Sequence, residues 1–212
     1  MKKRLLALAA LAALASAAQA QDTGSWLIRG RAVHLGSAND NSADLKSTLT
    51  AVVGAPAEAS INNKTIPEVD ISYFFSPNLA CELILTYPQS QDLRINGGKI
   101  GTFKHLPPTL TLQYHFTNLG GFRPYVGAGL NYTNISDVKW DPAVAALALN
   151  LKRSSYGLAF QAGIDVPMGG GWLFNVDVKK VQIQTDVTSA GTKIGTFGVD
   201  PLLVGVGFGK RF

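Results

Sequence analysis

Apolar and polar side chains alternate with a period of two through most of the chain, which is the pattern of β-strands with two different faces. The last stretch is the clearest case, because from Leu202 onward large apolar residues take one parity and small or polar residues the other. Eight such segments can be delimited, each near the ~9 to 11 residues that a tilted membrane strand needs. They are residues 25–35, 66–75, 79–87, 108–116, 122–133, 154–166, 172–183 and 201–212.

The connections between these segments alternate strictly in length. Residues 76–78, 117–121 and 167–171 are short and rich in Pro, Asn and Gly, whereas 36–65, 88–107, 134–153 and 184–200 are long. A soluble sandwich has no reason to alternate in this way. The pattern predicts an all-β fold, an eight-stranded antiparallel transmembrane β-barrel with short periplasmic turns and long extracellular loops.

Aromatic residues test which solvent surrounds the barrel. Fourteen of the sixteen aromatics in the predicted strands share the more apolar parity, and only Phe74 and Tyr125 take the other. A soluble barrel would place its large side chains inside. The distribution therefore predicts lipid outside and a polar interior.

The first 20 residues predict a cleaved signal peptide. Lys2, Lys3 and Arg4 precede an apolar run from Leu5 to Ala15, and a small-x-small site ends at Ala20. Cleavage leaves residues 21–212 as one barrel domain and 16 of the 19 Lys and Arg against 14 Asp and Glu. That balance does not suggest a nucleic-acid binder, and the single cysteine, Cys81, excludes an internal disulfide.

The inward parity collects ten charged residues. They are Arg29, Arg31, Arg123, Lys179 and Arg211 with Glu68, Asp70, Glu82, Asp165 and Asp177. An eight-stranded barrel is just wide enough for its own side chains, so we expect these charges to pair into a plug, with a direct role in transport as the alternative. Inward residues of the extracellular half are instead apolar and form a candidate channel lining: Val33, Leu35, Ile66, Ile84 and Leu203.

The long loops continue the apolar character. Asp141-Pro142 resembles a helix start, and Val144, Leu147, Ala148 and Leu151 follow at helical spacing, which predicts a short amphipathic helix in the third loop. Leu49, Val52 and Val53 add apolar positions to the first loop. These residues either pack the loops together or form an apolar entrance.

Prolines mark the outer ends of the second and fourth strands. Pro67, Pro107 and Pro108 have no N–H to donate, so they either protect strand ends or open a lateral exit into lipid near the outer ends of the first four strands. At the other end of the chain, Phe212 matches the terminal aromatic that outer-membrane barrels use as an assembly signal for the barrel-assembly machinery.

Catalysis and cofactors have little support. His34, His105 and His115 lie on three different elements, no nucleophile has a base at motif spacing, and the carboxylates alternate with cations instead of clustering as metal ligands. A lipid-modifying barrel enzyme with a site built from separate loops stays open as an alternative.

Several blocks resemble the outer membrane protein W family. The most specific are His105 to Thr109, with the sequence HLPPT, and Pro124 to Gly127, with the sequence PYVG. The resemblance implies an outer-membrane barrel of Gram-negative cells with a hydrophobic channel, in a porin-like family that includes proteins easing uptake of small apolar molecules. Two functions follow: passive uptake of small hydrophobic solutes, or a surface barrel acting as a structural or adhesion protein or a phage or bacteriocin receptor.

Overall fold

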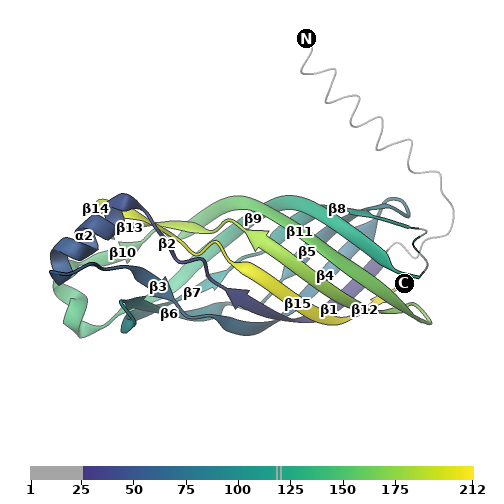
Figure 1. Cartoon of the computed structure of the whole chain (residues 1–212), viewed down its shortest axis with the longest axis horizontal. Helices are drawn as coiled ribbons and strands as arrows, with labels where there is room; N and C mark the ends of the chain where they lie inside the picture. The colour runs from purple at the N-terminus through teal and green to yellow at the C-terminus, as the bar shows by residue number, and fades with distance from the viewer. Residues whose placement is uncertain (1–25, 118, 120) are drawn as a thin grey trace, which may run out of the picture.

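The computed structural model describes residues 26–117, 119 and 121–212, and the predicted signal peptide lies outside them. Eight strands form a closed antiparallel barrel in the order β1, β4, β5, β8, β9, β11, β12 and β15 (Figure 1). The barrel strands are β1 (Trp26–Gly36), β4 (Lys64–Phe74), β5 (Leu79–Leu85), β8 (Thr109–His115), β9 (Arg123–Trp140), β11 (Ser154–Gly169), β12 (Trp172–Val181) and β15 (Leu202–Arg211). All eight predicted strands are confirmed.

The last strand closes the barrel against the first. β15 pairs with β1 from Leu27 opposite Arg211 to Gly36 opposite Leu202, and the backbone N–H of Phe212 donates to the carbonyl of Trp26 at 2.9 Å. The three predicted short turns join strands at one end of the barrel, which is the end where the carboxyl terminus lies (Figure 1).

The long connections are ordered β-structure that extends the barrel wall at the opposite end, beyond what the sequence predicts. β9 runs past the barrel and continues through the order β9-β7-β6-β3, and a second sheet has the order β10-β13-β14-β2. The added elements are β2 (Asp40–Asn41), α2 (Ala43–Val53), β3 (Ala59–Ile61), β6 (Gln89–Ile95), β7 (Gly98–Leu106), η2 (Pro142–Leu147), β10 (Leu149–Leu151), β13 (Gln184–Ser189) and β14 (Thr192–Gly198). We call this part the extracellular extension.

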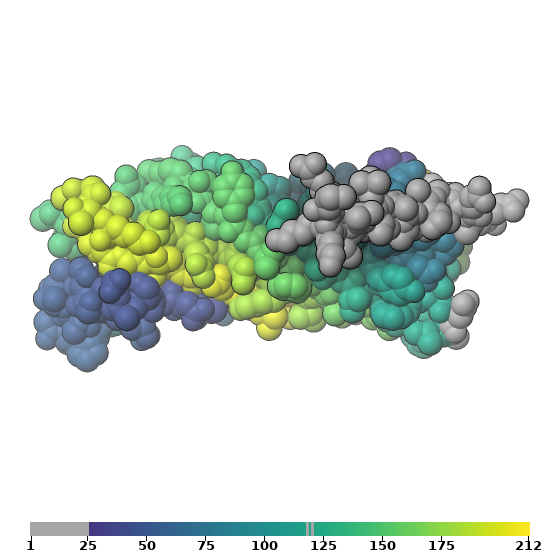
Figure 2. All heavy atoms as spheres, turned by 90° about the horizontal axis from the view of Figure 1, so that it is seen from above, coloured from purple at the N-terminus to yellow at the C-terminus, as the bar shows by residue number. Residues whose placement is uncertain are grey.

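The α-helix of the extension, α2, lies in the first long connection. Ser42 caps it by accepting from the N–H of Leu45, and Gly54 ends it in the left-handed conformation at φ 79°. Leu45 and Leu49 are buried on β14, and Figure 2 shows α2 in blue beside the yellow β13 and β14 hairpin. Among the described residues, no helix is both long and apolar enough to cross a membrane.

The predicted amphipathic helix of the third loop is wrong in type and extent. Asp141 does cap a helix by accepting from the N–H of Ala143 at 2.9 Å, but η2 is a 3₁₀ helix that buries none of its residues. Ala148 ends it at φ 44°, and Leu151 belongs to β10 instead. The apolar spacing there reflects a turn followed by a strand.

The outer surface of the barrel is apolar. Of the fourteen aromatics predicted to face lipid, thirteen are exposed and Phe174 is half-buried, whereas Phe74 and Tyr125 are 3% and 1% exposed. Trp26 contacts Tyr73 edge to face at 4.9 Å, and Tyr114 contacts Phe116 at 5.2 Å, as in an interfacial aromatic girdle. This surface is suited to hydrocarbon.

Candidate functional site: the barrel interior

Ion pairs fill the periplasmic half of the barrel. The Arg29 guanidinium donates two hydrogen bonds to Asp165, of 3.2 Å from Nε and 2.7 Å from Nη2, and forms an ion pair with Glu82 through Nη1. Ser72 donates to the same Glu82 carboxylate at 2.8 Å. Arg29 thus links β1 to β5 on one side and to β11 across the lumen.

Arg31 lies one inward position higher and has more ionic neighbours. Its nitrogens are 3.1 Å from Glu68, 2.7 Å from Asp70, 3.4 Å from Asp177 and 3.7 Å from Glu82. These carboxylates come from three different strands, so this one side chain ties opposite walls of the barrel together.

The third buried cation is Lys179, whose ammonium contacts Glu68 and lies 3.3 Å from Asp177. Asp177 in turn accepts from the hydroxyl of Tyr125 at 2.8 Å. Eight of the ten predicted charges therefore meet in one buried layer, which we call the charged layer: Arg29, Arg31, Lys179, Glu68, Asp70, Glu82, Asp165 and Asp177.

Arg123 and Arg211 depart from this prediction. Arg123 is exposed at the start of β9, and its side chain forms no ion pair with a carboxylate in the described part of the chain. Arg211 is half-buried, with its guanidinium carbon 4.0 Å from the ring centre of Phe74. Both residues have the inward parity that the sequence predicted. They occupy the last inward position of their strands, where the lumen meets the periplasm. The charged layer is left with three buried cations and five buried carboxylates.

An aromatic and apolar layer closes the barrel below the charges. Leu27, Phe74, Ala80 and Leu173 form a buried cluster. The His115 ring stacks on the Tyr125 ring with centroids 4.9 Å apart. The Phe74 ring centre lies 4.8 Å from that of His115. The periplasmic half therefore contains packed side chains in place of an open water pore.

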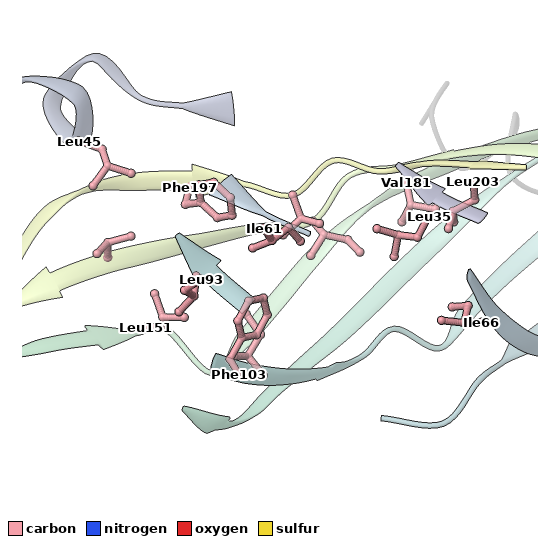
Figure 3. Close-up of a cluster of buried hydrophobic side chains, with 14 of the residues drawn as sticks. Leu35, Leu45, Ile61, Ile66, Leu93, Phe103, Leu151, Val181, Phe197 and Leu203 are labelled. Carbon is pink, nitrogen blue, oxygen red and sulfur yellow. The ribbon is translucent and has the colours of Figure 1, made fainter. Parts of the chain in front are cut away.

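Above the charged layer a continuous apolar cluster extends to the tip of the extension. A single cluster of buried apolar residues runs from Val33, Leu35, Ile66 and Leu203 in the barrel to Leu45 of α2. Figure 3 shows members of this cluster, with Leu35, Ile66, Val181 and Leu203 toward one end, Leu45, Phe197, Leu93 and Leu151 toward the other, and Ile61 and Phe103 between them. The sequence-based list found the lower part of this cluster only, because the loop segments were not predicted as strands.

A narrow cavity lies at the boundary between the charged and apolar regions. Leu35, Ile66, Ile84 and Leu203 line it, and Glu68 with Lys179 contributes its only ion pair. Its volume is about 30 Å³, far below the ~300 to 1,000 Å³ of a typical small-molecule site. Four of the five predicted lining residues thus meet here, and the fifth, Val33, is fully buried in the apolar cluster.

The barrel wall beside this cavity lacks part of its strand pairing. β1 and β4 stay paired up to Leu35 opposite Lys64, so the wall between the first and second strands is closed. The β4 to β5 ladder ends lower, at Val69 opposite Leu85, and the β5 to β8 ladder ends at Ile84 opposite Thr109. Above those rungs we find no strand pairing of β5 in the described structure, and we call this gap the β5 seam.

The three candidate prolines border this seam. Pro67 lies just above the last rung of β4, and its carbonyl accepts from the Thr86 hydroxyl at 3.0 Å. Pro107 lines the cavity, and Asn131 donates to the carbonyls of Pro107 and Pro108 at 3.2 Å each. The strand pairing therefore ends lower beside β5, between the second and fourth strands, than between the first and second strands.

The exterior of the extension is suited to water. Lys99, Lys104 and Lys193 form ion pairs with Asp92, Asp137 and Asp186 at 2.7, 2.7 and 2.6 Å. Hydrogen bonds from these lysines hold the pKa of each carboxyl below its ordinary value. The pKa of each carboxyl is lower in the folded protein than in the unfolded chain. The ion pairs therefore stabilise the extension at a pH above the ordinary carboxyl pKa, and this stabilisation is lost as the pH falls through the lowered pKa.

No cluster of three or more potential metal ligands occurs in residues 26–212 outside the two omitted positions. His115 lies in the barrel interior, His105 in the extension and His34 on the outside of β1, so the three histidines do not form one site.

Comparison with known proteins gives consistent matches. The OmpW family model matches residues 22–212. The chain is 39% identical to the uncharacterized outer-membrane protein y4mB of Sinorhizobium fredii, over 76% of this chain and 72% of that protein. It is 31% identical to outer membrane protein W of Escherichia coli over the full length of both.

Two further matches bear on fold and chemistry. The crystal structure of OprG from Pseudomonas aeruginosa superposes with a TM-score of 0.70 at 27% identity and covers 90% of this chain and 99% of that one. The dibenzothiophene metabolism operon protein PahQ of Pseudomonas aeruginosa is 28% identical, over 76% of this chain and 77% of that protein.

Proposed function

Because the chain belongs to the OmpW family of outer-membrane barrels, we propose that it carries small hydrophobic molecules passively across the lipopolysaccharide surface of the Gram-negative outer membrane. The supporting observation is the apolar interior that runs from α2 to the narrow cavity and ends on the charged layer. The name of the relative PahQ adds support, since dibenzothiophene is an apolar aromatic compound.

The charged layer argues against a path straight into the periplasm. A hydrophobic solute that reached Glu68 and Lys179 would lose its apolar contacts, which favour hydrocarbon by ~25 cal/mol per Å². The β5 seam lies in the barrel wall beside the same cavity. A solute that leaves sideways through the seam exchanges one apolar environment for another, so we assign the exit to this seam.

Uptake of radiolabelled octane by whole cells tests the proposal. Cells that express the protein should take up octane faster than cells that lack it. Leu203→Phe fills the cavity and should lower the rate, whereas Leu202→Phe, at the neighbouring lipid-facing position, should not. Equal uptake with and without the protein would refute the transport function.

A second candidate function is a surface barrel that transports nothing and acts as a structural protein, adhesin or receptor. Two observations favour it: the cavity is only about 30 Å³, and α2 covers the extracellular end of the interior. The same uptake experiment separates the two functions, because a surface barrel leaves octane uptake unchanged.

A further inference from the structure

One wall of the apolar interior carries polar side chains that the transport proposal does not use. Gln89 and Gln91 on β6 and His105 on β7 point inward and are 0%, 1% and 1% exposed. The register places Gln89 opposite His105 and Gln91 opposite Phe103, so the three side chains are neighbours on one patch of the sheet. We call them the polar patch.

Most of the polar atoms of this patch have no hydrogen-bond partner. Within the described structure, Oε1 of Gln89, both side-chain polar atoms of Gln91 and both ring nitrogens of His105 are buried and unpartnered. Nearly all buried polar groups in proteins are hydrogen-bonded to protein or water. Five unpartnered atoms on adjacent residues therefore mark a place where a polar ligand group fits.

The polar patch lies between two apolar cavities. Below it, Nε2 of Gln89 donates to the Thr86 hydroxyl at 3.2 Å, and Thr86 lines the narrow cavity beside the β5 seam. Above it, Leu93 follows Gln91 on the inward face of β6 and lines a second apolar cavity of about 30 Å³ near α2. The polar patch therefore lies on the interior wall between the cavity near α2 and the cavity beside the seam.

The chemistry of the patch indicates an uncharged partner. Amide groups supply a donor and an acceptor, and burial together with nearby Lys64 lowers the pKa of His105 to about 4, so the imidazole is neutral at pH 7 and also offers both. A hydroxyl or carbonyl group satisfies such atoms, whereas a pure hydrocarbon leaves them unpartnered. None of the three side chains carries a charge at pH 7, so they offer an anion no ion pair.

We propose that Gln89, Gln91 and His105 bind the polar end of a hydrocarbon that carries one uncharged hydroxyl or carbonyl group, while the apolar cavities hold its chain. This inference rests on the proposed transport function. The site would select alcohols, aldehydes, ketones or esters in preference to alkanes.

A binding experiment tests this independently of transport. Side-chain amide signals of glutamine and ring nitrogen signals of histidine are followed by NMR in nanodiscs, while 1-octanol, octane or octanoate is added. Saturable shifts of the Gln91 and His105 signals with 1-octanol, absent with octane, are expected. Equal shifts with octane, tighter binding of octanoate, or no saturable shift with 1-octanol would overturn the proposal.

Variants add a second readout. In the double variant Gln91→Leu with His105→Leu, 1-octanol should bind about 10-fold more weakly, because the loss of one or two hydrogen bonds has roughly that effect. Ser90→Val, at the outward-facing position between Gln89 and Gln91, is the matched control and should bind as the wild type does. If the double variant does not fold, the single Gln91→Leu replaces it, and unchanged binding in either contradicts the site.

Failure of this inference and failure of transport are distinguishable. Whole cells that take up octane and 1-octanol faster with the protein, but without NMR shifts at the polar patch, would retain the transport function and remove the site. Shifts at the patch without any protein-dependent uptake would retain the site and remove transport.

Discussion

Arg31 has more carboxylate partners than any other side chain of the charged layer. Its guanidinium lies within 4 Å of four carboxylates, and none of them has another arginine as close except Glu82. Arg31→Met should therefore leave the buried Asp70 without a cation, and Glu68, Asp177 and Glu82 with one cation fewer. We expect it to lower the free energy of unfolding by about 3 to 5 kcal/mol, measured by urea denaturation in detergent.

The matched control for this prediction is Arg123→Met. Arg123 is exposed and forms no ion pair among the described residues, so its replacement should change stability by no more than about 0.5 kcal/mol. Equal losses in both variants would show that the charged layer is hydrated and screened.

Side-chain parity predicted the charged layer because strand residues alternate strictly between two faces. It could not give the height of Arg123 and Arg211 relative to the membrane, which depends on the tilt and register of the strands. Nor could it assign partners: the contact between Arg29 and Asp165 joins residues 136 positions apart. The polar patch was missed because residues 88–107 read as a loop.

At the scale of elements, the sequence predicted every barrel strand but not the extension. Strands of a barrel wall carry a strong period-two pattern, since lipid contacts one face. The extension strands have water outside and contain shifts of register such as the one between Leu93 and Arg94. Their pattern is therefore weak. α2 was missed because only Leu45 and Leu49 are buried on it.

Gly195 fixes the position of α2. A β-carbon there would lie 2.5 Å from the backbone N of Leu45, and the residue has φ +154°. We expect Gly195→Val to displace α2 and to speed tryptic cleavage at Lys46 by about 10-fold, because overpacking costs roughly 1 to 3 kcal/mol. Thr192→Val, at an exposed position of the same strand, should leave the cleavage rate unchanged, and equal rates in both variants would show that α2 is not held by β14.

Phe212 tests the closing strand. Its ring is 60% exposed on the lipid face, and its N–H completes the pairing between β15 and β1. Phe212→Ala should reduce the yield of heat-modifiable, folded barrel in the outer membrane because it removes the terminal aromatic. Phe160→Ala, at an equally exposed lipid-facing position of β11, should not. Equal yields from both variants would refute an assembly role for the terminal residue.

The protein has three surroundings for its side chains: lipid, water and its own interior. Lipid contacts the aromatic outer surface of the barrel, water contacts the ion pairs on the extension, and the interior changes from apolar to charged at the narrow cavity. The β5 seam is a place in the described barrel wall where this boundary meets a gap in strand pairing. Lateral release of solutes into lipid therefore requires that they leave through the β5 seam.

Reversible closure of the seam tests that dependence most directly. Cysteines at Pro67 and Tyr87, in a Cys81→Ser background, face each other across the seam, because both positions are exposed and continue the Val69 to Leu85 register by one outward-facing pair. The control pair, at His34 and Thr65, crosslinks β1 to β4 where these strands are already paired.

The measurement is the rate of octane uptake by whole cells before and after oxidation, with reduction by dithiothreitol to restore the open state. We predict that oxidation lowers the rate for the Pro67 and Tyr87 pair, that reduction restores it, and that the His34 and Thr65 pair responds to neither. An unchanged rate after complete crosslinking of the seam would contradict lateral exit and require a path through the charged layer.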